Sequence, residues 1–288
     1  MSHPPKHSKA SGGGKRPGPP RRTGASGARV GGRVLLSLGA WLGLTLSLAA
    51  PASASPRLRI AAASDLREAL PALLRAFDPA LAPQVQVSFG ASGKLATQLA
   101  QGAPFDVFLS ADAQRVDQLL RSGHGQAGTR TAFATGQLVL WFPRARAPLA
   151  PLGLRALAQD PSLRLAIAHP QHAPYGRAAV EALQHAQLFG LLGPRLIRAE
   201  NVAQAGQFAA SGGADCALIA RALVRAPGLR DGASWAVPPG WHRPVQHVAV
   251  VTAPGPAALA TRWVRFLGQP AAQRILTQFG YMPAVRLP

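Results

Sequence analysis

The chain has 288 residues, 48% hydrophobic and 15% charged, and this composition excludes a disordered polypeptide and indicates a globular body of two domains or two lobes. A single cysteine excludes a disulfide framework and any multi-thiolate zinc or iron–sulfur site. The net charge of +20 is concentrated at the start, because residues 1–33 hold eight of the 31 basic residues and no acid. No basic run interleaved with aromatic residues follows, so we expect no nucleic acid as a partner.

Residues 1–54 are typical of a leader for secretion. An uncharged apolar run at residues 34–50 follows the basic segment, and an Ala-Ser-Ala triplet at residues 52–54 provides a small-residue cleavage site. We therefore expect a secretory signal peptide and a periplasmic mature protein that begins near Ser55. The alternative is an uncleaved membrane anchor, for which the run is close to the lower length limit.

Apolar strands and amphipathic helices alternate along the rest of the chain, which is typical of an α/β sheet protein. The patterns predict strands at residues 57–63, 85–89, 105–110, 137–142, 164–168, 197–199, 216–220 and 245–251. They predict helices at residues 65–77, 94–102, 111–123, 176–190, from 202 onwards, 258–267 and 271–279. Residues 235–244 are rich in proline and aromatic residues and predict a loop.

The order of these elements suggests a chain that leaves one lobe and later returns to it. We assign residues 55–136 to the first part of lobe I, residues 137–251 to lobe II and residues 252–288 to the returning part of lobe I. Two α/β lobes joined by two crossing segments place a cleft between them, and such clefts bind small ligands.

Four predicted helices begin directly after a strand with a small or flexible residue. Helix N-termini present unpaired N–H groups and the positive end of the helix dipole, so several of them at one point make an anion site without lysine or arginine. The alternative for each serine is a helix cap that contributes only stability. The four positions are Ser64-Asp65, Ser92-Gly93, Tyr175-Gly176 and Asn201-Val202.

Four segments together resemble the molybdate-binding periplasmic proteins of ABC transporters, which have the type 2 periplasmic-binding fold. The segments are AAASDL at 61–66, SFGASGKLATQLAQGAPFDVFLSAD at 88–112, HPQHAPYGRAAVEAL at 169–183 and AENVAQA at 199–205. The resemblance implies that serine hydroxyls and backbone N–H groups hold an oxyanion between the lobes. The implied ligand residues are Ser64, Asp65, Ser92, Tyr175 and Val202, and they bind molybdenum only as its oxyanion, with no direct metal ligand and no cofactor.

The sequence departs from some family members at Ala220, where they carry a ligand-binding tyrosine. Two roles therefore stay open for Tyr175, which can supply either its phenol or its backbone N–H. Pro174 and Gly176 flank it and favour a turn that presents main-chain donors.

Several polar residues near these motifs have simpler interpretations. We expect Asp65, with Glu68 three positions on, to cap its helix and to offer only its N–H to the cleft. Lys94 and Arg177 lie in first helical turns, where we expect solvated side chains. His169 and His172 lack a third metal ligand at a suitable spacing, so we expect them at a loop or cleft edge. Asp106 and Asp112 flank a predicted strand, where we expect capping and lobe packing.

Taken together, these features predict a monomeric, non-enzymatic solute-binding protein that captures molybdate, and by similarity tungstate, for a membrane permease. Molybdate is a fully deprotonated dianion at neutral pH, so a site made only of hydrogen-bond donors suits it, whereas hydrogen phosphate needs an acceptor. The alternatives are a carrier of sulfate or thiosulfate, a sensor built on the same fold, and a hydrolase.

Overall fold

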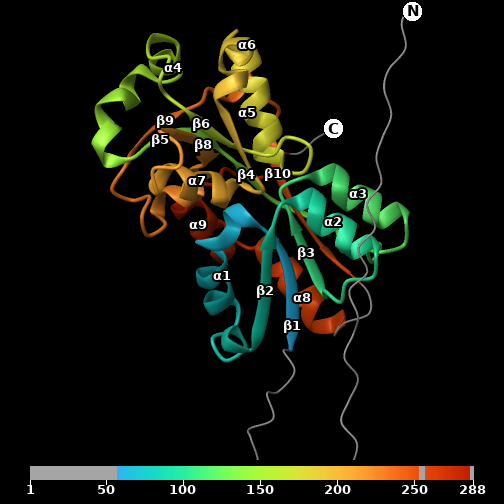
Figure 1. Cartoon of the computed structure of the whole chain (residues 1–288). Helices are drawn as coiled ribbons and strands as arrows, with labels where there is room; N and C mark the ends of the chain where they lie inside the picture. Colours follow the sequence, from blue (N-terminus) through green and yellow to red (C-terminus); the bar gives the residue numbers. More distant parts are fainter. Residues whose placement is uncertain (1–56, 253–256, 286–288) are drawn as a thin grey trace, which may run out of the picture. The chain divides into compact units, whose positions relative to one another are not determined.

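Two five-stranded sheets organise the described part of the chain (Figure 1). The computed structural model describes residues 57–252 and 257–285, which belong to one compact unit. The predicted leader at residues 1–54 lies outside the described residues. Among the described helices, none is long and apolar enough to cross a bilayer. The fold class is α/β, as the sequence predicts.

The first sheet, which with its helices we call lobe I, has the strand order β2-β1-β3-β10-β4. β1 pairs in parallel with β2 and β3, whereas β10 runs antiparallel to β3 and β4. The strands are β1 (Leu58–Ala63), β2 (Val85–Gly90), β3 (Val107–Ser110), β4 (Thr131–Gly136) and β10 (Val245–Val251). The helices are η1 (Ser64–Arg67), α1 (Leu70–Phe77), η2 (Ala82–Gln84), α2 (Ser92–Ala100), α3 (Ala113–Arg121), α8 (Ala257–Leu267) and α9 (Pro270–Gln278).

The second sheet, which with its helices we call lobe II, has the order β7-β6-β8-β5-β9. β6 is parallel to β7 and β8, and β5 is antiparallel to β8 and β9. The strands are β5 (Leu138–Phe142), β6 (Leu165–Ala168), β7 (Leu196–Ala199), β8 (Cys216–Ala220) and β9 (Ala233–Ala236). The helices are η3 (Arg144–Leu152), α4 (Arg155–Gln159), α5 (Pro174–His185), α6 (Phe189–Leu192), η4 (Gly193–Arg195), α7 (Val202–Ala210), η5 (Arg221–Arg225) and η6 (Pro239–Trp241).

Helices cover both faces of the lobe I sheet, which explains its apolar strands. Ala61 of β1 packs with Leu95 of α2 and Leu119 of α3, whereas Ile60 and Ala62 belong to the core on the other face. Successive residues of a strand point to opposite faces, so a strand covered on both sides is mainly apolar. The strand ends are therefore the places where polar residues of the site are expected.

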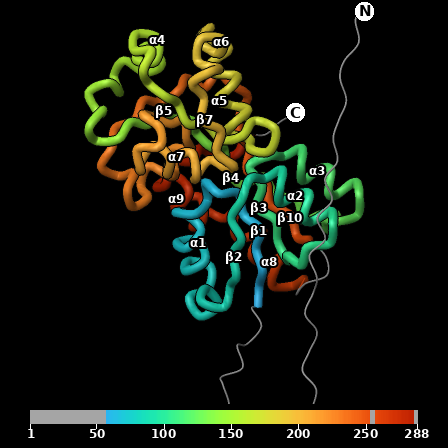
Figure 2. The backbone as a smooth tube through the Cα atoms, in the orientation of Figure 1, coloured from blue at the N-terminus to red at the C-terminus, as the bar shows by residue number. Residues whose placement is uncertain are grey.

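The chain crosses between the lobes twice, and Figure 2 lets the reader follow both crossings. The first lies at Gln137, between β4 and β5, and the second precedes β10. The sequence pattern places residues 137–251 in lobe II, whereas β10 pairs with β3 and β4 of lobe I. Local periodicity identifies a buried strand but not the sheet that it joins, because distant pairing decides this.

Local structure also departs from the sequence patterns at other points. The helix predicted at residues 65–77 is divided into η1 and α1, and Pro71 stands at the start of α1. Proline donates no hydrogen bond and its ring clashes with the carbonyl four residues before it, so one continuous helix cannot form there. The patterns do not predict β4, and β9 begins before the segment for which they predict a loop.

Candidate functional site

The four predicted helix starts lie at the junction of the two lobes. η1 and α2 follow β1 and β2 of lobe I, and α5 and α7 follow β6 and β7 of lobe II. η1 packs against α7. The backbone N–H of Gly93 in α2 donates to the carbonyl of His172, just before α5, at 2.9 Å. The structure therefore brings together the segments that the sequence selected.

Ser64 and Ser92 are buried at this junction, with 2% and 1% of their surface exposed. Neither serine caps its helix, because Ala63 and Ala91 occupy the N-cap positions of η1 and α2 and neither cap is closed by a side-chain hydrogen bond. The Ser92 hydroxyl instead accepts a hydrogen bond from Ala111 N at 3.0 Å, which leaves its own proton available for donation. The capping alternative is therefore wrong for both serines.

Tyr175 and Val202 occupy the first turns of their helices, where N–H groups have no intrahelical acceptor. In α5 the backbone bonds begin with Gly176, which donates to the carbonyl of Ala173 at 3.0 Å. In α7 the side chain of Asn201 accepts from Gln204 N at 3.0 Å, so the cap leaves the Val202 amide to another partner. Tyr175 and Val202 are 2% and 3% exposed, which makes their N–H groups buried donors.

Asp65 has a role that the sequence did not predict. Its Oδ2 accepts from Tyr175 Oη at 3.1 Å and from Tyr281 Oη at 2.8 Å, and it lies 2.7 Å from His247 Nε2. We call these four buried residues the Asp65 cluster. η1 has no side-chain cap, so the expectation that Asp65 caps its helix is wrong. The carboxylate is committed to distant side chains instead.

The electrostatics of the Asp65 cluster favour an ionised carboxylate. Desolvation raises the pKa of Asp65, but the charge of His247 and the hydrogen bonds from the cluster outweigh it and lower that pKa overall. Burial, followed by the Asp65 charge, raises the pKa of Tyr175 and of Tyr281 well above the usual range. Two buried polar atoms, Asp65 Oδ1 and His247 Nδ1, have no hydrogen-bond partner among the described residues.

Two ion pairs also link the lobes around the junction. Lys94 Nζ lies 3.1 Å from Glu200 Oε1, and Arg177 donates to Asp112 Oδ2 at 2.8 Å. Lys94 and Arg177 remain partly exposed to solvent, as the sequence predicts, but each also pairs with an acidic residue of the other lobe. Asp112 also caps α3 through Gln114 N at 3.1 Å, which confirms its expected role in capping and lobe packing.

A cleft of about 610 Å³ lies beside these contacts. It is lined by the first turns of α3 and α5 and by residues 243–246. Ser64, Ser92, Tyr175 and Val202 are not in its lining. The candidate site is therefore distinct from this cleft and lies at the four helix starts.

Comparison with known proteins identifies the family of this chain. Residues 58–282 match the model of a family described as bacterial extracellular solute-binding protein. The chain belongs to this family of solute-binding proteins. It is 35% identical over 242 residues to the molybdate-binding protein ModA of Rhodobacter capsulatus, covering 84% of this chain and 94% of that protein. It is 33% identical to ModA of Azotobacter vinelandii, covering 86% and 96%.

Solved structures share the fold of this solute-binding protein. The periplasmic molybdate-binding protein of Azotobacter vinelandii has a TM-score of 0.72 and 31% identity, covering 80% of this chain and 99% of that chain. The sulfate-binding protein SubI of Mycobacterium tuberculosis has a TM-score of 0.64 and 18% identity, covering 78% and 86%. At 18% identity, the second comparison shows the fold alone.

The two histidines that follow β6 of this solute-binding protein stack on each other. The ring centroids of His169 and His172 are 4.8 Å apart, with an interplanar angle of 21°. Desolvation, followed by the charge of His169 and of Lys94, lowers the pKa of His172. Within residues 57–252 and 257–285 no group of three His, Cys, Asp or Glu side chains is placed to hold a metal ion. The pair lies at the lobe junction, because the His172 carbonyl accepts the hydrogen bond from Gly93 N of lobe I.

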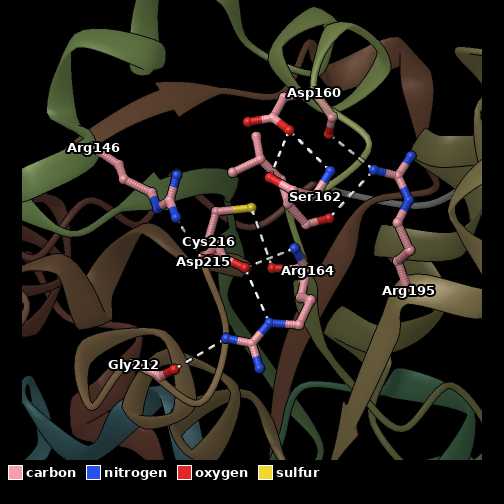
Figure 3. Close-up of polar contacts among 9 residues, drawn as sticks. Arg146, Asp160, Ser162, Arg164, Arg195, Gly212, Asp215 and Cys216 are labelled. Carbon is pink, nitrogen blue, oxygen red and sulfur yellow. Dashed lines mark hydrogen bonds and ion pairs between the residues drawn. The ribbon is translucent and has the colours of Figure 1, made fainter.

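Other charged groups of this solute-binding protein lie at the opposite ends of the lobe II strands (Figure 3). Asp215, just before β8, accepts from Arg146 at 2.9 Å and from the backbone and side chain of Arg164 at 2.9 and 3.1 Å. Burial raises the pKa of the neighbouring Cys216 thiol, which disfavours the nucleophilic thiolate form. These arginines bind Asp215 near the first residues of β6 and β8, whereas the candidate site lies beyond the last residues of the strands.

Sequence reasoning missed His247 and Tyr281. One signal was available for His247, because it is the single histidine in the apolar strand Val245–Val251, and a buried imidazole requires a hydrogen-bond partner. Tyr281 follows α9 and carries no comparable signal. Its partner Asp65 lies 216 residues away in the sequence.

Proposed function

We propose that this protein captures molybdate and tungstate in the periplasm and delivers them to the membrane permease of an ABC transporter. The observation that supports the proposal is the buried set of donors at the four helix starts, which comprises two serine hydroxyls and two helix-start amides. A fully deprotonated dianion accepts hydrogen bonds at all its oxygens, so such a set can bind it without a cationic side chain.

Similar proteins favour molybdate among the oxyanions that such a donor set could bind. Two proteins named as molybdate-binding share more than 30% identity with this chain and are covered almost end to end. We assign Ser64, Ser92 and the amides of Tyr175 and Val202 as oxyanion donors, and we assign the N–H of Asp65 as a further contact. The proposed protein is a monomer and performs no chemistry on its solute.

Titration calorimetry of the purified protein tests this function. We expect molybdate and tungstate to bind with one site per chain, and sulfate and phosphate to bind more weakly. Sulfate binding tighter than molybdate binding would identify a sulfate carrier instead. Turnover of generic ester or phosphoester substrates would contradict the absence of catalysis.

We also propose that residues 1–54 are removed during export. The basic segment, the apolar run and the Ala-Ser-Ala triplet support this proposal. Mass spectrometry of the protein recovered from the periplasm should give a chain that begins near Ser55. A mature chain that still contains Trp41 would favour a membrane-tethered protein.

A further inference from the structure

The Asp65 cluster contains one residue from lobe II and three from lobe I. Asp65 follows β1, His247 lies in β10 and Tyr281 follows α9, whereas Tyr175 lies in α5 of lobe II. The hydrogen bond of 3.1 Å from Tyr175 Oη to Asp65 Oδ2 therefore spans the two lobes. It is buried, unlike the ion pairs that also span them.

The phenol of Tyr175 also packs directly on a crossing segment. A Cβ atom on Gly136 would overlap Tyr175 Oη and would lie 3.0 Å from His247 Cε1. Gly136 is the last residue of β4, just before the chain enters lobe II. The phenol thus occupies a space that exists because this position has no side chain.

Lobe I holds the Asp65 carboxylate firmly in place. His247 Nε2 lies 2.7 Å from its Oδ2, and the single proton of Tyr281 Oη is shared between that oxygen at 2.8 Å and the Asp65 carbonyl at 3.0 Å. All the members of the cluster are at most 3% exposed. The carboxylate is therefore a fixed acceptor that can orient a donor from the other lobe.

Fixing the phenol of Tyr175 also fixes the main chain of the same residue. Tyr175 is the second residue of α5, and its N–H is one of the unpaired donors of the first turn. If the lobes separate, the hydrogen bond to Asp65 must break and the amide moves away from Ser64. The bond therefore favours the arrangement in which donors from both lobes face one oxyanion.

We propose that Asp65 and Tyr175 are a positioning pair that sets lobe closure in this carrier, through side chains that do not touch the oxyanion. His247 holds the Asp65 carboxylate for this purpose. The identity of the oxyanion rests on the proposed function, whereas the contact between the lobes does not.

The first test compares two variants that each remove one phenol from the same carboxylate. Tyr175→Phe removes the contact between the lobes, and we expect molybdate affinity to fall about 10- to 100-fold in calorimetry. Tyr281→Phe removes a contact within lobe I, and we expect at least threefold less affinity loss with a comparable loss of stability. Equal losses of affinity, or no loss in Tyr175→Phe, would overturn the proposal.

A second readout separates lobe closure from direct ligand contact. Spin labels on cysteines introduced at Arg121 in lobe I and Leu191 in lobe II report the distance between the lobes, and the buried Cys216 should not react. At saturating molybdate we expect the wild type to give one short distance and Tyr175→Phe to give a longer or broader distribution. Identical distributions at saturation would mean that the phenol acts on the ligand and not on closure.

A third measurement needs no oxyanion and so separates failure of this proposal from failure of the proposed function. A double-mutant cycle of Tyr175→Phe and Asp65→Asn is followed by urea unfolding, and we expect a coupling of about tenfold in the unfolding equilibrium constant. No coupling would overturn the pair. A wild-type protein that gives no heat with molybdate would refute the proposed function alone. If Asp65→Asn does not fold, His247→Gln takes its place in the cycle.

Discussion

Replacing Ser92 by alanine tests the oxyanion site through one oxygen atom. The Ser92 hydroxyl accepts from Ala111 N at 3.0 Å, and both residues are at most 2% exposed. Its removal leaves a buried N–H without a partner, which costs about 1–3 kcal/mol of unfolding free energy. The same change also removes the donor that we assign to the oxyanion.

The loss of affinity is the signal that distinguishes an oxyanion donor from a serine with a purely structural role. A hydrogen bond to a charged group contributes roughly 1.5–3 kcal/mol, so we expect Ser92→Ala to weaken molybdate binding about 10- to 150-fold. Calorimetry measures this change. Urea unfolding gives the stability and must be done without molybdate, because ligand at 100 times its Kd adds about 2.7 kcal/mol.

Ser110→Ala provides the matched control. Ser110 is fully buried in lobe I, and among the described residues its hydroxyl bonds only to the backbone of Asp112, accepting at 3.0 Å and donating at 2.9 Å. We expect a similar loss of stability with affinity within about twofold of the wild type, since no charged hydrogen bond is lost. Unchanged affinity in Ser92→Ala, or equal losses in both variants, would refute the assignment of Ser92 as an oxyanion donor.

Three further predictions concern the lobe junction. In Gly93→Ala the new Cβ would lie 2.8 Å from the His172 carbonyl oxygen of lobe II. Overpacking of about 1–3 kcal/mol at this contact between the lobes should weaken molybdate binding at least fivefold in calorimetry. Arg177→Met should weaken binding by no more than about fivefold, an effect that disappears at 1 M salt, because its pair with Asp112 is partly exposed. The pKa of Asp65 is lowered in the folded protein, so the unfolded chain binds the proton first as the pH falls. The free energy of unfolding should therefore decrease below about pH 4. Asp65→Asn should flatten this decrease in acid titrations followed by circular dichroism.

The sequence predicted the elements of the site better than their partners. Strand ends followed by helix starts are local patterns, so the amino-acid sequence alone is enough to select the four positions. The family resemblance then implies Ser64, Ser92, Tyr175 and Val202 as the ligand residues. Whether they bind the oxyanion stays a prediction. The structure also places the Tyr175 phenol on Asp65, which is consistent with a backbone role for Tyr175.

Contacts between residues far apart in the sequence could not be predicted from local patterns. The partners of Asp65 lie 110, 182 and 216 residues away in the chain, and no local pattern records such distances. The same reason explains why the sequence pattern assigns β10 to the wrong lobe. Its residues show that both faces are buried, but pairing with β3 and β4 depends on the order in which distant strands meet.

The position of β10 also has a consequence for how the protein folds. All strands of lobe II lie between residues 138 and 236, whereas β4 joins the lobe I sheet through β10. Lobe II can therefore complete its sheet before β10 is available to complete the sheet of lobe I. Sheets closed by such distant segments fold slowly and expose unpaired strand edges meanwhile. We expect a chain truncated before β10 to form lobe II and to leave β3 and β4 open to aggregation.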